Sequence, residues 1–497
     1  MKAEAAMEAA GAPPPPGAID KDDDGRPKRQ GTVWSAAAHV ITGVIGSGVL
    51  SLAWSFAQLG WIAGPIVLLI FAYLTYYTSA LLADCYRFPD PTTGKRNYRY
   101  KDAVKVTLGR VELWLCALAQ YSNLAATAVG YTVTGALSMA AIARANCLHT
   151  KGSKALGCGV SVNLYVTAFG LIQLVFSQIP NFHELWWLSY LATAMSFTYS
   201  TIVLVLGLAK LIGMYVLDLF LFFCFFFLAT HISTLHEFAG NGRVSGSPGG
   251  LVTTPAQKTW AVFQALGNVA FAYSFSMILI EIQDTLRSTP PENKTMKKAT
   301  LVGVLATTAF YMSIACVNYA AFGDSAPGNL LSQGFEKPYW LIDFSNACIV
   351  LHLVGAYQVY SQPLFDFVEA WALEKWPHSA LNTTHKIKLL HWRYSTTLFR
   401  LVWRSLFVIA TTVIAMAIPF FNDVLGLLGA MGFWPLTVYF PIQMHIKQAQ
   451  IKTWSMRWLK LQAISAFCLV ISIAAGIGSI EGIYQDLKAY TPFHANF

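Results

Sequence analysis

The first part of this chain carries no charged side chain from Gly31 to Ala83, a stretch that holds two apolar spans. Three glycines interrupt the middle of the first span, at Gly43, Gly46 and Gly48. Each glycine inside a helix costs roughly 1 kcal/mol relative to alanine, and backbone groups freed at membrane depth persist only where protein or a polar cavity satisfies them. The pattern indicates either an unwound helix at a binding site or small residues that let neighbouring helices approach closely.

Composition is typical of a polytopic membrane protein. Of the 497 residues, 55% are hydrophobic and 12% are charged, against about 25% charged in soluble domains. The Lys and Arg residues behind the net charge of +9 lie in loops between apolar spans, which indicates positive-inside topology rather than nucleic-acid binding. Residues 1–32, with Pro13–Pro16 and the charge run from Asp20 to Arg29, are predicted to be a disordered cytoplasmic tail.

Apolar windows of about 20 residues predict an all-α protein with eleven transmembrane helices. They lie at residues 33–56, 61–83, 113–142, 162–179, 186–209, 260–283, 299–321, 339–371, 401–419, 423–446 and 459–480. Five of them fill a first repeat over 33–211, and five fill a second over 260–446, as expected of an inverted repeat. An extracellular loop is expected at 241–259, and the eleventh helix and C-terminal tail at 447–497.

A further apolar run, Leu211–Thr230, directly follows the fifth span. If it does not cross and the N-terminus is cytoplasmic, the later cytoplasmic loops carry fourteen Lys and Arg residues and the outside segments carry four. A single crossing would reverse that bias, and twenty residues cannot cross twice. We therefore predict an interfacial or re-entrant segment, or a chain that does not insert properly. The sequons at Asn293 and Asn382 should then stay unglycosylated.

Span 6 is interrupted at a position that corresponds to the break in span 1. It is polar at mid-depth, with Gly267, Asn268, Tyr273, Ser274 and Ser276. Paired interrupted helices point to a transporter's binding site; alternatively, the serines bond back to the preceding turn and only bend a continuous helix. If both helices unwind, their half-helix N-termini suit a carboxylate and the bare carbonyls suit an ammonium. A zwitterion such as an α-amino acid fits both.

Signature motifs are spread in order over the chain. They are Gly31–Trp54, Gln58–Pro65, Phe176–Pro180, Met195–Tyr199, Ile280–Thr285 and Phe433–Pro441. These segments closely resemble plant amino acid permeases of the amino acid/auxin permease family, over about residues 31–211 and 240–497. The resemblance implies a plasma-membrane symporter that moves neutral and often acidic amino acids with protons, on a fold like that of LeuT-type transporters.

The chain departs from the family pattern in three places. The stretch Ile212–Gly240 looks inserted, Asn268 stands where members commonly carry Asp, and Gln443 stands where they carry Glu. The loss of either acid bears on proton stoichiometry or on the preference for substrate charge. The insertion leaves a second function open, which is a non-transporting sensor or an inactive isoform.

Candidate substrate contacts come from the two breaks and from span 3. The breaks supply Gly46, Ser47, Gly48, Tyr273, Ser274 and Phe275. Span 3 supplies Asn123 and Tyr131, which share a stripe with Gln120 and Thr127 at helical spacing. Such stripes are also typical of interhelical packing.

His39 and Glu281 are the candidates for proton coupling, because an ionisable side chain within the bilayer is a functional hypothesis by default. His39 lies two turns before Gly46, and Glu281 follows the second break, so both are on the cytoplasmic side. If spans 1 and 6 pack together, the two can pair, bind a proton from an acidic exterior and release it inside. Alternatively, His39 is a hydrogen-bonded packing residue and Glu281 ends span 6 beside Arg287.

The remaining candidates are expected to serve structure. Asp343 and Asp423 lie near span ends, where they could cap helices, and His352 is expected to be structural. Cys147 and Cys158 share a hydrophilic loop that is predicted to be extracellular, where a disulfide can form. No C-x-x-C, G-x-S-x-G, H-E-x-x-H or Walker A motif is present, so we expect no metal, no cofactor besides the proton as coupling ion, and no enzyme activity.

Overall fold

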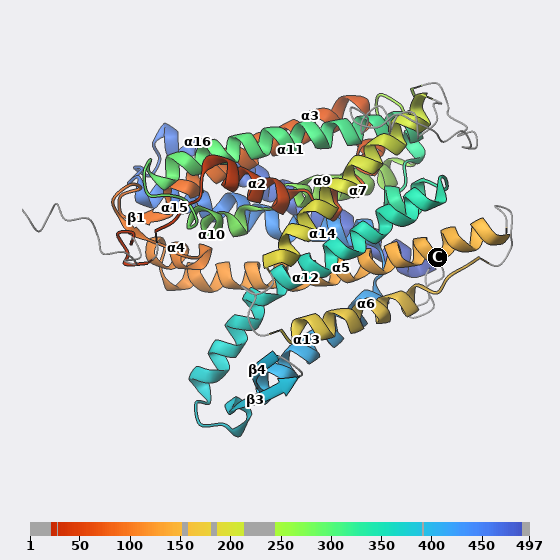
Figure 1. The fold of residues 1–497 in the computed structure, drawn as a ribbon. Coiled ribbons are helices and arrows are strands. Elements are labelled where there is room, and N and C mark those ends of the chain that lie inside the picture. Colours follow the sequence, from red (N-terminus) through yellow and green to blue (C-terminus); the bar gives the residue numbers. More distant parts are fainter. Residues whose placement is uncertain are drawn as a thin grey trace, which may run out of the picture.

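The computed structural model describes residues 21–26, 28–151, 158–179, 186–212, 244–389 and 392–489. These residues form a bundle of long helices (Figure 1). Within the described ranges, nine helical segments are long and apolar enough to cross a membrane, and two shorter apolar helices are Val33–Val44 and Val162–Ser177. The expected multi-pass helical protein is confirmed, while the total of eleven crossings and the repeat symmetry stay predictions.

The first half of the bundle follows the expected order of apolar spans. It contains α2 (Val33–Val44), the 3-10 turn η1 (Ser47–Ser51), α3 (Leu52–Asp84), α4 (Tyr100–Thr107), α5 (Arg110–Lys151), α6 (Val162–Ser177) and α7 (Trp186–Ile212). Gly60 divides α3, because its φ of 80° is a left-handed conformation that favours glycine. A Cβ at Gly60 would also overlap the backbone of Pro248–Gly250. The first and second spans therefore meet at Gly60.

The second half contains two more interrupted spans. Its elements are α9 (Pro255–Ala272), the 3-10 turn η3 (Ser276–Ile278), α10 (Leu279–Gln283), α11 (Glu292–Phe322), α12 (Tyr339–Lys375), α13 (Leu398–Ala417), α14 (Phe421–Gly432), the π-helical η7 (Phe433–Tyr439), α15 (Phe440–Gln448) and α16 (Met456–Ala489). Short turns fill the connections at η4 (Gly323–Ser325), η5 (Leu330–Gly334) and η6 (Ala380–Asn382). The sixth span thus consists of α9, η3 and α10, and the tenth consists of α14, η7 and α15.

Two small antiparallel hairpins correct the all-α prediction. Strand β1 (Arg87–Phe88) pairs with β2 (Lys95–Arg96), and β3 (Thr384–Leu389) pairs with β4 (Trp392–Thr397). The β3–β4 hairpin projects from the helical bundle beyond α12 and α13 (Figure 1). Polar and apolar residues alternate from Lys386 to Leu389, which is the period of a strand. Such a segment is too polar to form an apolar window of about 20 residues.

The two ends of the bundle are defined by contacts between distant segments. At one end, the Gly31 amide donates to the Thr285 carbonyl at 2.9 Å, so α2 begins where α10 ends. At the other end, the Lys210 ammonium lies 3.7 Å from the centre of the Phe322 ring, and the Ser245 amide donates to the Ala320 carbonyl at 2.8 Å. We call these the inner end and the outer end, because the charge bias predicts that they face the cytoplasm and the exterior.

Both flanks of the extra apolar run lie at the outer end. Lys210 precedes it and Ser245 follows it, and both contact the last turn of α11. Residues 213–243 lie outside the described residues, so the interfacial or re-entrant placement of Leu211–Thr230 stays a prediction. The chain nevertheless leaves and re-enters the described bundle at the same end.

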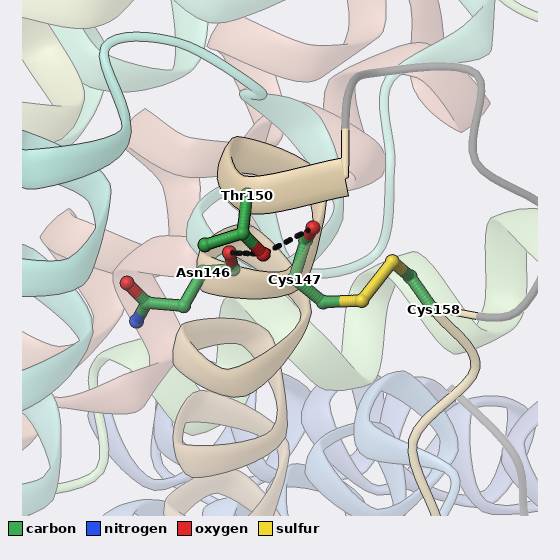
Figure 2. Close-up of a disulfide and its surroundings, with 4 residues drawn as sticks. All are labelled: Asn146, Cys147, Thr150 and Cys158. Atoms are coloured by element: carbon green, nitrogen blue, oxygen red, sulfur yellow. Dashed lines mark hydrogen bonds between the residues drawn. A yellow bond between two sulfur atoms is a disulfide. The ribbon is translucent and has the colours of Figure 1, made fainter.

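A disulfide joins Cys147 to Cys158, with 5.7 Å between their Cα atoms. Figure 2 shows Cys147 near the C-terminal end of α5, where the Thr150 hydroxyl donates to the carbonyls of Asn146 and Cys147 at 3.0 Å each. Cys158 lies shortly before α6. The disulfide that the sequence allows is therefore present, and it ties α5 to the start of α6.

We expect the double substitution Cys147→Ser and Cys158→Ser to lower the melting temperature of the purified protein. A disulfide constrains the unfolded chain and typically adds about 2–4 kcal/mol to the free energy of unfolding. Cys316→Ser, which changes a half-buried free thiol, is the matched control. Equal melting temperatures of the two variants would contradict a stabilising role.

Candidate substrate site

The first break lies at the glycine run. Helix α2 ends at Val44, and Ile45 (φ −75°, ψ 91°) and Gly46 (φ −133°, ψ −153°) are extended. A 3-10 turn then begins at Ser47 and leads into α3. The predicted interruption of span 1 is thus present, with Gly46 at its centre.

The second break lies between α9 and η3. Helix α9 ends at Ala272, and Tyr273 (φ −105°, ψ 10°) and Phe275 (φ −120°, ψ −5°) depart from helical geometry. The Ser274 hydroxyl does donate back to the Ala270 carbonyl at 3.0 Å, as the alternative interpretation expects. The helix is nevertheless interrupted rather than bent, because regular α-helix resumes only at Leu279.

The two breaks lie against each other. A Cβ built on Gly48 would lie 3.2 Å from the Ala272 Cα, and one on Gly43 would lie 2.9 Å from the Ile278 Cδ1. Two of the three glycines therefore serve close packing, as the second interpretation of the run expects. Gly46 alone occupies the unwound backbone, so the run serves both purposes.

One hydroxyl joins the carbonyl ends of both broken helices. Tyr311, fully buried on α11, has its hydroxyl 2.5 Å from the Val44 carbonyl oxygen and 3.3 Å from the Ala272 carbonyl oxygen. These residues end α2 and α9, where carbonyls lose their helical partners. A hydroxyl carries one hydrogen, which is directed to the nearer Val44 carbonyl. The expectation of a bare carbonyl is therefore wrong at Val44, while the Ala272 carbonyl keeps acceptor capacity.

His352 faces the first break from α12. Its Nδ1 lies 2.8 Å from the Ala192 carbonyl oxygen on α7. Since a carbonyl only accepts, Nδ1 carries the hydrogen, and Nε2 of the neutral ring is left as an acceptor. A Cβ built on Gly46 would lie 4.0 Å from that Nε2. The sequence predicts a structural role for His352. The direction of its second nitrogen depends on how α7, α12 and the break pack together, and the sequence does not show that packing.

The remaining predicted substrate contacts are buried around this centre. The Tyr273 hydroxyl lies 2.9 Å from the Thr308 hydroxyl on α11. The Asn123 amide nitrogen donates to the Leu428 carbonyl on α14 at 3.1 Å, and the Tyr131 ring packs edge-on against Tyr360 of α12. Asn123 and Tyr131 thus make the interhelical contacts that the alternative interpretation expects, and their role in binding stays a prediction.

The two proton-coupling candidates are not joined in this structure. His39 lies on the exposed side of α2. The Glu281 carboxylate instead accepts from the Tyr100 amide at 3.3 Å, at the N-terminus of α4, where a carboxylate is favoured by the helix dipole. Arg287 does not pair with Glu281 either, because its Nε donates to the Gln30 carbonyl. Neither a hydrogen bond nor an ion pair links His39 to Glu281 among the described residues, and their role in coupling stays a prediction.

A cluster of three buried arginines closes the inner end. Arg29 pairs with Asp22 and Asp24 at 3.0 and 2.8 Å, and with Asp284, just after α10, at 2.8 Å. Arg87 and Arg96, from the β1–β2 hairpin, both pair with Glu292 at the start of α11. Asp23 pairs with Arg87 and Arg96 at 2.8 and 2.6 Å, and we call these three arginines and their five acids the inner cluster. It ties the segment before α2 to the hairpin and to the loop between α10 and α11.

The inner cluster corrects the prediction of a disordered tail through residue 32. Asp22, Asp24 and Arg29 are buried there by their partners, because an acidic run complements arginines that would otherwise be buried without a counter-charge. Hydrogen bonds from Arg29 hold the pKa of Asp24 well below its usual range. Burial opposes the effect at Asp22, but hydrogen bonds from Arg29 and Ser288 still lower its pKa.

The lowered pKa values keep Asp22 and Asp24 charged at neutral pH. Carboxylates of this kind stabilise the folded state at pH values above their unfolded pKa of about 4. That contribution is lost only as the pH falls through the lower folded pKa. The contribution of these two carboxylates therefore does not change with pH around neutrality.

The sequence matches one transporter family over most of its length. Residues 29–485 match the family model described as transmembrane amino acid transporter protein. The chain belongs to this family. It is 54% identical to amino acid permease 3 of Arabidopsis thaliana over 482 residues, which cover 96% of this chain and 95% of that protein. It is 52% identical to amino acid permease 4 of the same plant, over 96% of this chain and 98% of that protein.

A solved structure shows the same fold at low sequence identity. The crystal structure of MhsT in complex with L-phenylalanine matches with a TM-score of 0.52 and 10% identity, covering 92% of this chain and all of that one. The resemblance to plant amino acid permeases is thus confirmed, as is the expected LeuT-type fold. A member of this transporter family is not an enzyme, as the sequence predicts.

In this transporter, we expect Asp24→Asn to weaken closure of the inner end. An ion pair of this kind contributes about 1 kcal/mol, which corresponds to roughly a fivefold change in an equilibrium. The apparent affinity for external amino acid should fall by about that factor, measured as the KM of uptake. Asp90→Asn is the matched control, since that exposed carboxylate accepts hydrogen bonds from Thr92 and Thr93 in its own turn. An unchanged KM for Asp24→Asn would exclude this gating role.

Proposed function

We propose that this chain is a proton-coupled symporter that imports neutral and acidic amino acids across the plasma membrane, with its N-terminus in the cytoplasm. The observation that carries the proposal is the pair of helix breaks that face each other at Gly46 and Tyr273. Family membership supports amino acid transport. The coupling to protons, the substrate range and the location in the plasma membrane go beyond family membership and are the rest of the proposal.

The substrate would lie between the two breaks. The amides at Ser47 and Gly48 open a new helical segment after the first break, and such amides suit a carboxylate. The Nε2 of His352 is an acceptor on the same side of the break, which suits an ammonium group. An α-amino acid supplies both groups within one short molecule. Tyr273, Ser274 and Phe275 would border the site from the second break, and Asn123 and Tyr131 from α5.

Alternating access requires the inner end to open. The inner cluster joins segments next to both broken helices, since Arg29 precedes α2 and Asp284 follows α10. Its charged hydrogen bonds favour the closed inner end. In the proposed cycle, amino acid and proton load from the outside, and the segments joined by the inner cluster then separate.

Uptake of a labelled amino acid tests the proposal in cells that lack their own amino acid transport. We expect several-fold faster uptake at an external pH of about 5.5 than at about 7.5, because the external proton concentration rises about a hundredfold. A protonophore should abolish the difference. Uptake that ignores both pH and protonophore would exclude coupling to protons.

A variant without Ile212–Gly240 belongs in the same assay. If both proteins transport, the inserted stretch is compatible with function. If only the shortened protein transports, the full chain is the inactive form or sensor that the sequence left open. The comparison therefore separates the two candidate functions.

Substitution of the predicted proton carriers shows which of them acts. We expect His39→Gln or Glu281→Gln to flatten the dependence of uptake on external pH, because glutamine does not titrate. His352→Gln keeps an acceptor and a donor near Gly46 but loses the Nε2 position that would accept from the substrate ammonium, so it should raise the substrate KM. Unchanged pH dependence in the first two variants, with normal amounts at the cell surface, would remove both residues from the mechanism.

A further inference from the structure

Asp423 is a buried acid without a cation. It lies in the first turn of α14, where Phe420 and not Asp423 is the cap residue, so the expected capping role is wrong. Only 5% of Asp423 is exposed, and its Oδ1 accepts from the Gln264 amide on α9 at 2.9 Å. None of the ion pairs in the described part of the chain includes Asp423. A fully charged carboxylate in such a place would be unfavourable.

Its second partner is another acid. Asp486 lies near the end of α16, one helical turn after Gly482, and a Cβ at Gly482 would overlap the Asp423 Oδ1, so the two carboxyl groups are neighbours that interact. Two ionised carboxylates this close repel each other, and one shared proton removes that repulsion. The arrangement of the pair therefore favours the binding of one proton. Asp486 is exposed and Asp423 is buried, so the pair reaches from the surface into the bundle.

Unpartnered polar atoms continue inward from the pair. Gly426 and Gly482 lack side chains where α9, α14 and α16 meet, and a Cβ at Gly482 would overlap the Asp423 Oδ1. The Ser479 hydroxyl and the Asn268 side-chain oxygen surround Gly426. Both residues are fully buried, and neither atom has a hydrogen-bond partner among the residues described.

These groups form a polar seam that ends near the second break. We define the seam as Asp486, Asp423, Gln264, Ser479 and Asn268. Gln264 and Asn268 are one turn apart on α9, and Tyr273 begins the break five residues after Asn268. With a helical rise of about 1.5 Å per residue, the distance along α9 from Gln264 to Tyr273 is roughly 13 Å.

Other charged groups near the pair have partners of their own. On α9, the Lys258 ammonium donates to the carbonyls of Gln58, Gly249 and Leu251 in the outer-end loop. On α16, Glu481 accepts from Gln485, and Lys488 donates to Gln485. Helix α5 presents Gly130 to Val424 and Leu428, with no charge at that level.

We propose that Asp423 and Asp486 are the outer proton-binding site of this transporter, and that the seam connects this site to the second helix break. A hydronium ion in the external water gives its proton to the pair and leaves as water, and the charge of the pair changes from −2 to −1. When the transporter opens inward, a water molecule that reaches the seam through the second break carries the proton away as hydronium, and the pair returns to −2. This inference rests on the proposed proton symport, and it assigns the external loading site to residues distinct from His39 and Glu281.

The test uses Asp486→Asn and Asp423→Asn in the full chain. Removal of the Asp486 charge takes away the neighbour that favours proton binding, so half-maximal uptake should move to a more acidic external pH by about one unit. Because Asp486 is exposed, this variant should fold normally. Asp423→Asn mimics the protonated acid. It should lose concentrative uptake but keep exchange of labelled for unlabelled amino acid within about twofold, a readout that also reports folding.

Glu481→Gln, five residues before Asp486 on α16, is the matched control and should keep the original pH profile. The double variant should behave as Asp423→Asn alone, since the two acids bind one proton together. A wild-type pH profile in Asp486→Asn, while the unmodified protein is proton-driven, would overturn the inference alone. If uptake by the unmodified protein does not change with external pH, the proposed proton symport is wrong, and this inference is wrong with it.

Discussion

Backbone groups freed at the two helix breaks are the constraint on which the rest of this structure depends. A bilayer offers no water to the carbonyls at the ends of α2 and α9, so the protein must supply a donor. The Tyr311 hydroxyl donates to the Val44 carbonyl and lies 3.3 Å from the Ala272 carbonyl oxygen. The two breaks are thereby held at one level and against one helix, α11. The glycine at position 48 then follows, because a Cβ there would lie 3.2 Å from the Ala272 Cα, and Gly43 leaves space for the Ile278 side chain.

The two ends of the bundle use charge in opposite ways. At the inner end, three arginines face five acids, and the strong charged hydrogen bonds hold that end closed at neutral pH. At the outer end, the neighbouring acids Asp423 and Asp486 have no cation between them, an arrangement that favours the binding of a proton over a salt bridge. Arginine does not deprotonate in proteins, so only the arrangement of paired acids is suited to loading a proton.

Local patterns predicted much of the fold and part of the site. Apolar windows located the spans, and the two breaks followed from Gly46 and from the polar run around Tyr273. The roles of His352 and Asp423 could not be read this way, because each depends on one contact across the bundle, with Ala192 and with Asp486. In the sequence alone, the charge run near Arg29 has the composition of a solvent-exposed tail. Only the distant Asp284 and Glu292 show that it is part of the closed inner end.

The site depends on how the chain connects α7 to α9, because the apolar run Leu211–Thr230 lies between these two helices. Lys210 and Ser245 both contact the end of α11, so the chain returns to the outer end before α9 begins. The second break therefore keeps the orientation it needs to face Gly46. Helix α7 packs against α11 and α12, and α9 packs against α14 and α16. Because these contacts involve only segments outside residues 213–243, the geometry of the breaks follows from the bundle itself.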